Sequence, residues 1–259
     1  MSLFSQQHSA VRPSPVFWGI CALTAVSGVL AWSSGPNPTT LARIGVFVFI
    51  LAGWLLSLCL HEFGHAYTAW RYGDHGAEIR GYLTLDPLKY SNPLLSLGLP
   101  LLFIAMGGIG LPGGAVYVQT AGMTPAQKTR VSLAGPAANL VLGVLLLGAV
   151  GLFGTHDADH WVFWSALAFM GFLQVTALVL NILPIPGLDG YSALEPHLSP
   201  DTQRAMWPVK QWGFLVLILL LFTPALNRWF FGVIDAIVGL FGVPGGLVGL
   251  GVRLFQFWT

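Results

Sequence analysis

Residues 44–70 read IGVFVFILAGWLLSLCLHEFGHAYTAW, and this run decides the fold class. A helix needs roughly 20 apolar residues to cross a hydrocarbon core of about 30 Å, and the run exceeds that length. Its polar groups gather near one end, at His61, Glu62 and His65. The run therefore predicts a transmembrane helix that carries ionisable side chains within the membrane.

The composition of the whole chain agrees with this reading. Of the 259 residues, 55% are hydrophobic and only 8% are charged, which is far too little charge for a soluble domain. The formal net charge is +1 and the basic residues are scattered, so the pattern excludes a nucleic-acid-binding surface. Cys21 and Cys59 both lie in apolar runs and predict neither a disulfide framework nor a cysteine zinc site.

Six segments approach or exceed the length of a span. They are residues 16–32, 44–70, 129–152, 161–183, 211–227 and 232–257. The first follows Arg12, is long and lacks a small-x-small cleavage pattern, so it predicts a retained signal anchor. We expect an α-helical polytopic membrane protein with about six transmembrane helices, forming a single domain over residues 1–259.

The apolar stretch 93–118 differs from the spans because it is rich in proline and glycine. These residues disfavour a continuous helix facing lipid, so we expect a re-entrant loop or hairpin covered by other helices. The alternating patterns at residues 82–85 and 115–118 predict short membrane-associated β-strands. An exposed strand edge there could pair with an extended peptide.

The distribution of Lys and Arg favours one orientation, since cytoplasmic loops collect these residues. Six spans with both termini cytoplasmic leave only Arg43 and Arg228 outside. The cytoplasmic set is then Arg12, Arg71, Arg80, Lys89, Lys128, Arg130, Arg204, Lys210 and Arg253. We therefore expect an integral membrane protein whose amino and carboxyl termini both face the cytoplasm.

His61, Glu62 and His65 form the motif HExxH. Residues four apart on a helix share a face, so both imidazoles can reach one metal ion while Glu62 acts as a base beside it. With a rise of about 1.5 Å per residue, His61 lies about 26 Å along a helix that starts near Ile44, close to the cytoplasmic edge. A chance pattern is the alternative, but ionisable residues are rare inside membranes and usually functional.

A catalytic zinc ion normally takes three protein ligands and leaves one position open, so a third ligand is expected elsewhere. Asp189 is the best candidate, because Pro184 and Pro186 interrupt the preceding span and Gly190 permits unusual backbone angles. This segment can turn a carboxylate back towards the two histidines. The alternative is an aspartate in an ordinary proline-rich turn.

Three motifs in this order resemble the site-2 protease family of intramembrane zinc metalloproteases. They are HEFGH at 61–65, LAGPAAN at 133–139 and PGLDG at 186–190, and the likeness covers roughly residues 41–195. The resemblance implies one Zn²⁺ per chain bound by His61, His65 and Asp189. It also implies that Glu62 activates water, that Asn139 positions the substrate or stabilises the oxyanion, and that the protein lies in a bacterial or archaeal plasma membrane.

The chain departs from the family pattern at two points. Ile185 precedes Pro186 where the common motif has Asn-Pro-x-x-Asp-Gly, although Asn181 lies upstream. The length leaves no room for PDZ or CBS regulatory domains, so we expect a minimal form of the family. Asn139 also has a packing explanation, because Asn in a membrane helix can hydrogen-bond to a neighbouring helix.

The leading hypothesis is a zinc-dependent intramembrane endopeptidase that cleaves transmembrane segments of proteins. Its expected partners are a transmembrane protein or peptide substrate and the lipid bilayer, and the oligomeric state stays open. A non-proteolytic metal-binding or metal-transport protein is the main alternative, and a structural metal in an assembly protein is a third. His156, Asp157, Asp159 and His160 are expected to form a solvated outer loop rather than a second metal site.

Overall fold

The computed structural model of the chain describes residues 10–90, 116–210, 212–256 and 258. Four of its helices are long and apolar enough to cross a membrane. They are α1 (Pro15–Trp32), α2 (Thr40–Arg71), α5 (Pro125–Leu152) and α6 (Trp161–Asn181). These helices confirm the long apolar helices predicted at residues 16–32, 44–70, 129–152 and 161–183.

The starts of three long helices are set by capping side chains. The hydroxyl of Ser14 accepts a hydrogen bond from the Phe17 amide, and Thr39 does the same for Ala42 at the start of α2. Thr124 and Gln127 form a reciprocal capping box at the start of α5. Each cap satisfies amides that the first helical turn leaves without a partner.

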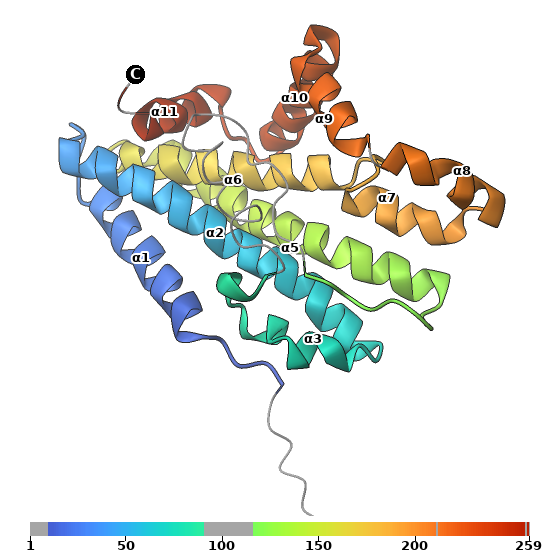
Figure 1. The fold of residues 1–259 in the computed structure, drawn as a ribbon. Coiled ribbons are helices and arrows are strands. Elements are labelled where there is room, and N and C mark those ends of the chain that lie inside the picture. Colours follow the sequence, from blue (N-terminus) through green and yellow to red (C-terminus); the bar gives the residue numbers. More distant parts are fainter. Residues whose placement is uncertain (1–9, 91–115, 211, 257, 259) are drawn as a thin grey trace, which may run out of the picture.

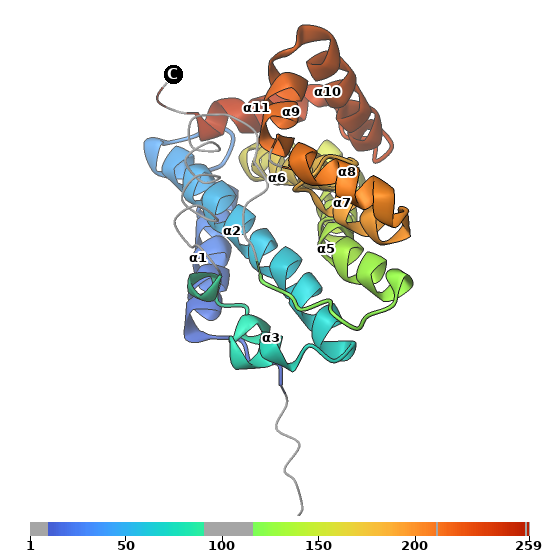
Figure 2. The ribbon, with the colours of Figure 1, turned by 45° about the vertical axis from the view of Figure 1, so that its right-hand side comes forward.

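The four long helices pack against one another (Figure 1 and Figure 2), and the side chains of α6 are the most buried of the four. Helix α2 contacts α1, α5 and α6, and α5 also contacts α6. The approach of α2 to α5 is close, because a Cβ on Gly64 would lie 2.7 Å from the carbonyl oxygen of Ala134. This crossing brings the HExxH motif against the LAGPAAN motif.

Shorter helices surround this group. They are α3 (His75–Ile79), η1 (Tyr82–Thr84), η2 (Pro87–Lys89), η4 (Gly154–His156), α7 (Asp189–Leu194), η5 (Glu195–His197), α8 (Pro200–Lys210), α9 (Gly213–Phe222), α10 (Pro224–Gly239) and α11 (Gly245–Phe255). In Figure 1, α3 lies beyond the carboxyl end of α2, whereas α7 and α8 follow the carboxyl end of α6.

The expectation of six spans is not confirmed. Helices α9, α10 and α11 have 10, 16 and 11 residues, each fewer than the roughly 20 that a span needs. The predicted span 232–257 breaks between α10 and α11, where Gly242 has a φ of 70° and Pro244 follows. The described residues therefore provide four spanning helices, or five if α8 and residues 215–222 form one bent span.

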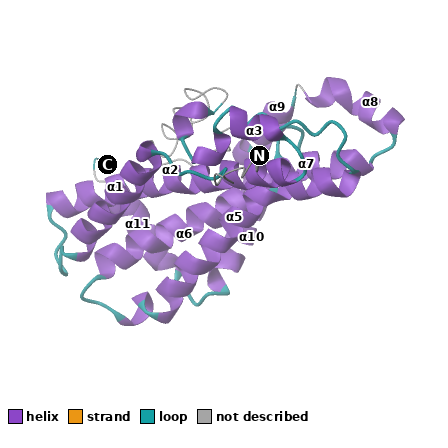
Figure 3. Ribbon diagram, turned by 90° about the horizontal axis from the view of Figure 1, so that it is seen from below, coloured by secondary structure: helices purple, strands orange, loops and turns teal. Residues whose placement is uncertain are grey.

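The strand predicted at residues 82–85 is wrong. Tyr82–Thr84 form the 3₁₀ helix η1, because Gly81 and Leu85 on either side adopt left-handed conformations with φ of 75° and 54°. Figure 3 shows no strand in the described parts of the chain. Residues 116–118 have no regular secondary structure, and residues 93–115 of the predicted re-entrant region lie outside the described ranges.

The two described ends of the chain lie at different ends of α2. The Ser14 amide donates to the carbonyl of Thr84, beyond the carboxyl end of α2. Trp258 instead packs against Phe47, near the amino end of α2, because α11 runs back along α6 and α2 after the break at Pro244. The side of the membrane on which each terminus lies stays a prediction.

Candidate metal centre

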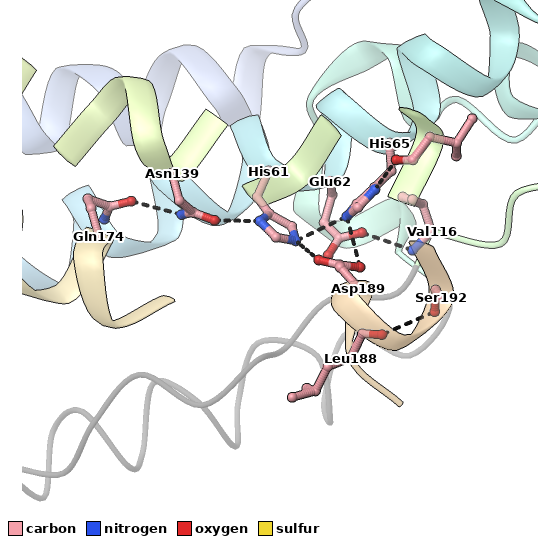
Figure 4. Close-up of polar contacts among 10 residues, drawn as sticks. His61, Glu62, His65, Val116, Asn139, Gln174, Leu188, Asp189 and Ser192 are labelled. Carbon is pink, nitrogen blue, oxygen red and sulfur yellow. Dashed lines mark hydrogen bonds and ion pairs between the residues drawn. The ribbon is translucent and has the colours of Figure 1, made fainter. Parts of the chain in front are cut away.

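Three predicted ligands come together between α2 and the start of α7 (Figure 4). The Nε2 atoms of His61 and His65 are 3.1 Å apart. The Oδ2 and Oδ1 atoms of Asp189 lie 3.3 Å and 3.4 Å from the Nε2 atoms of His61 and His65, respectively. Both histidines are buried, and the three side chains form a group that could hold a metal ion.

The outer nitrogens of the two imidazoles are engaged elsewhere. The Nδ1 atom of His65 donates to the carbonyl of Val131 at 2.8 Å, and the Nδ1 atom of His61 bonds to Oδ1 of Asn139 at 2.6 Å. A neutral imidazole has one N–H group, so both Nε2 atoms turn lone pairs towards Asp189. Two lone pairs and a carboxylate at this distance repel one another unless a cation lies between them.

The ligand atoms lie close enough together to surround one zinc ion. Zinc binds histidine nitrogen and carboxylate oxygen at about 2.0–2.1 Å, which places tetrahedral ligands about 3.3–3.4 Å apart. The Nε2 atoms of His61 and His65, 3.1 Å apart, are close to this spacing, and the contacts of 3.3 and 3.4 Å from Asp189 come from its two different oxygens. Three protein ligands leave the fourth position for water, as in catalytic rather than structural zinc sites.

Helix α5 leaves room for this group through Gly135. A Cβ at that position would lie 2.3 Å from Nε2 of His65 and 2.6 Å from Nε2 of His61. Real contacts are never that short, so a side chain here would occupy the space that the ligands face. Val131 and Asn139, four residues to either side on the same helix, bond the two imidazoles.

Asp189 is carried to the site by a turn after α6. Gly187 has a φ of 96°, and a Cβ on Gly190 would lie 2.2 Å from the carbonyl oxygen of Ile182, so the segment folds tightly against the end of the helix. A metal ion between Asp189 and the two imidazoles would favour the ionised form of Asp189.

Glu62 neighbours the group and is also buried. Its Oε2 atom accepts a hydrogen bond from the backbone amide of Val116 at 3.1 Å. Glu62 and the three ligands line the same cavity of about 950 Å³, which also extends past Asn181. The site thus combines a carboxylate base with space for a second molecule.

The other polar residues considered from the sequence have different partners. His160 bonds Asp157 and stacks on Trp32 with ring centroids 3.8 Å apart, which ties the loop between α5 and α6 to α1. Glu195 pairs with Lys210. Across the described ranges, only His61, His65 and Asp189 form a cluster with metal-ligand spacing.

Comparison with known proteins gives relatives over almost the whole chain. A protein of Mycolicibacterium smegmatis named "Putative zinc metalloprotease Rip2" is 64% identical over 97% of this chain and 96% of its own length. The protein of the same name from Mycobacterium tuberculosis H37Rv is 60% identical over 98% of this chain and 97% of its own length. A Bacillus subtilis protein named "Putative zinc metalloprotease YwhC" is 29% identical over 70% of this chain and 83% of its own length.

The chain belongs to the site-2 protease family of zinc metalloproteases. Membership in this family makes it a hydrolase of peptide bonds that uses zinc, and its apolar helices place it in a membrane. No family profile and no solved structure matched the chain.

Three features of this site-2 protease centre were missed from the sequence. Gln174 of α6 accepts a hydrogen bond from Asn139, the Val116 amide bonds Glu62, and Gly135 provides clearance at the ligands. The contact of Gln174 had one signal in the sequence, which is a glutamine inside an apolar helix. Backbone contacts such as that of Val116 leave no trace in residue types.

Proposed function

We propose that the protein is an intramembrane endopeptidase that cleaves transmembrane segments of protein substrates. In this proposal His61, His65 and Asp189 hold the zinc ion and Glu62 is the catalytic base. The observation that carries the proposal is the burial of His61, Glu62 and His65 in helix α2, which has the length and composition of a membrane span. A peptide bond that reaches them must come from within or beside the membrane.

Zinc, when bound, acidifies water and polarises the scissile carbonyl. Glu62 accepts the proton of the attacking water and passes it to the leaving amine. The Val116 amide holds one carboxylate oxygen of Glu62, which fixes the side chain beside the ligand group. His61 and His65 keep their Nε2 atoms directed at the centre because their Nδ1 atoms are bonded.

Residues 116–120 support a binding place for an extended substrate. Val116, Val118 and Thr120 line the cavity, and this alternation is that of an extended chain. On the other side, Arg80 donates to the carbonyl of Tyr117 and the Gln119 amide donates to Asp74. A helical substrate must unwind before its carbonyls are free, and pairing with this segment would hold the unwound part.

The role expected for Asn139, positioning substrate or stabilising the oxyanion, stays a prediction. Its side chain is 3% exposed, with Oδ1 on His61 and Nδ2 on Gln174. For Nδ2 of Asn139 to turn towards an oxyanion, its hydrogen bond to Gln174 would have to break. These contacts favour a role in orienting His61.

We propose that the site end of α2 faces the cytoplasm of a bacterial or archaeal plasma membrane. Arg71 ends α2 there, Arg130 bonds Tyr72, and Lys128 lines the cavity. This excess of basic residues is typical of the cytoplasmic side. The amino-terminal end of α1 shares that side, through the bond from Ser14 to Thr84.

The test is cleavage of single-span peptides by purified protein in vesicles, with the cut mapped by mass spectrometry. Glu62→Gln should abolish cleavage, whereas Glu78→Gln, a matched change at a residue that bonds the Trp70 indole outside the cavity, should not. Wild-type cuts should fall inside the apolar segment. Cuts confined to flanking loops, or cleavage by Glu62→Gln at the wild-type rate, would overturn the proposal. Zinc uptake by vesicles that survives Glu62→Gln would instead favour a metal carrier.

A further inference from the structure

Gln174 is a polar side chain in the middle of the apolar helix α6, and it is 1% exposed. Thr176 of the same helix serves its own backbone, because its hydroxyl donates to the carbonyl of Phe172 at 2.8 Å. Gln174 instead reaches α5, where its Oε1 accepts from Nδ2 of Asn139 at 2.9 Å. A buried amide in a membrane helix is costly unless it has partners, so this contact calls for a role.

Helix α5 packs closely against Gln174. Asn139 and Gly143 are four residues apart and share a face of α5. A Cβ on Gly143 would lie 3.6 Å from the Cβ of Gln174, so even the smallest side chain there would touch Gln174. Met170, one turn earlier on α6, faces the amide nitrogen of Gln174 with its sulfur at 3.9 Å. This leaves the Oε1 atom of Gln174 for Asn139.

The contact determines which end of the Asn139 amide faces His61. With Nδ2 bonded to Gln174, Oδ1 points to Nδ1 of His61 and accepts its proton. The reverse orientation would place an N–H donor against Nδ1 and favour the proton on Nε2. That tautomer of His61 cannot bind a metal through Nε2, the atom that faces Asp189.

We propose that Gln174 is a positioning residue for the metal centre, acting through Asn139 to hold His61 in the tautomer that binds zinc. This rests on the proposed ligand set of His61, His65 and Asp189. Removing the acceptor of Gln174 should weaken zinc binding. Groups that orient metal ligands typically contribute 10–100-fold in affinity, and we expect about tenfold for Gln174, which is one bond further out.

The experiment measures zinc affinity of the purified protein by competition with a chelator, without any substrate. Gln174→Met keeps the length but removes the acceptor and should bind zinc about tenfold more weakly. Gln174→Glu keeps an acceptor oxygen and should stay within about threefold of wild type. Thr176→Val is the matched control, because it removes a buried polar group of the same helix outside this chain of bonds, and it should match wild type.

The double variant separates positioning from general packing. If Gln174 acts through Asn139, Gln174→Met should change nothing further in an Asn139→Ala background. Three outcomes would overturn the proposal. Gln174→Met could lower zinc affinity equally with and without Asn139, or it could bind zinc as tightly as wild type. Gln174→Glu could bind zinc as weakly as Gln174→Met. Wild-type protein that binds zinc but cleaves no substrate would contradict the proposed function and leave this inference standing.

Discussion

A Cβ on Gly135 of α5 would lie 2.3 Å from the Nε2 atom of His65 on α2. The same atom would lie 2.6 Å from Nε2 of His61. Neither imidazole can swing away freely, because Val131 and Asn139 hold their Nδ1 atoms. Position 135 is therefore restricted to glycine by the metal centre and not by backbone conformation.

Gly135→Ala should weaken zinc binding at least tenfold, because the imidazoles must break those hydrogen bonds to make room. Gly148→Ala is the control on the same helix, where an added Cβ meets nothing within 4 Å. That change should keep zinc affinity and raise stability by up to about 1 kcal/mol through helix propensity. Equal zinc affinities in the two variants would contradict the close approach of α5.

Asp74→Ala should destabilise the fold by about 1.5–3 kcal/mol, because the buried carboxylate accepts from the Gln119 amide at 2.7 Å and pairs with Arg80. Asp201→Ala removes an equivalent pair with Arg204, but the two side chains are 91% and 81% exposed. Its effect should stay within about 0.5 kcal/mol. Thermal unfolding of both proteins gives the comparison, and similar losses would contradict the anchoring of residues 116–120.

Asp157 should make stability depend on pH in the acidic range. The pKa of Asp157 is held below its usual value, mainly by the hydrogen bond from the indole N–H of Trp164 and also by the bond to His160. The pKa of an aspartate in the unfolded chain is about 3.9, and a lower pKa in the folded protein stabilises the fold at pH above that value. This stabilisation is lost as the pH falls through the pKa of Asp157 in the folded protein. The difference in Tm between wild type and Asp157→Asn should therefore be full at pH 6 and shrink below about pH 4. A constant difference would contradict the contact.

The sequence predicted the four long helices and the meeting of the two histidines with Asp189. Apolar length defines such spans, and the spacing of four residues fixes His61 and His65 on one face of a helix. Asp189 could be found because prolines and Gly190 marked a turn after a span. Its approach to the histidines depends on tertiary packing, which spacing alone leaves open.

The carboxyl-terminal spans are not confirmed, and the strand predicted at residues 82–85 is wrong. Hydropathy averages over a window and does not register one break, such as that at Gly242 and Pro244. Alternating residues at 82–85 matched a strand, but the left-handed conformations of Gly81 and Leu85 curl the segment into a 3₁₀ helix. Local backbone geometry outweighed the side-chain pattern there.

The most direct test of the account measures zinc content and cleavage together in wild type, Glu62→Gln and Asp189→Asn. We predict one zinc per chain and cleavage in wild type, and one zinc without cleavage in Glu62→Gln, because that residue moves a proton and holds no metal. Asp189→Asn should lose both zinc and activity. An Asp189→Asn protein that keeps one tightly bound zinc and cleaves at the wild-type rate would contradict the ligand set.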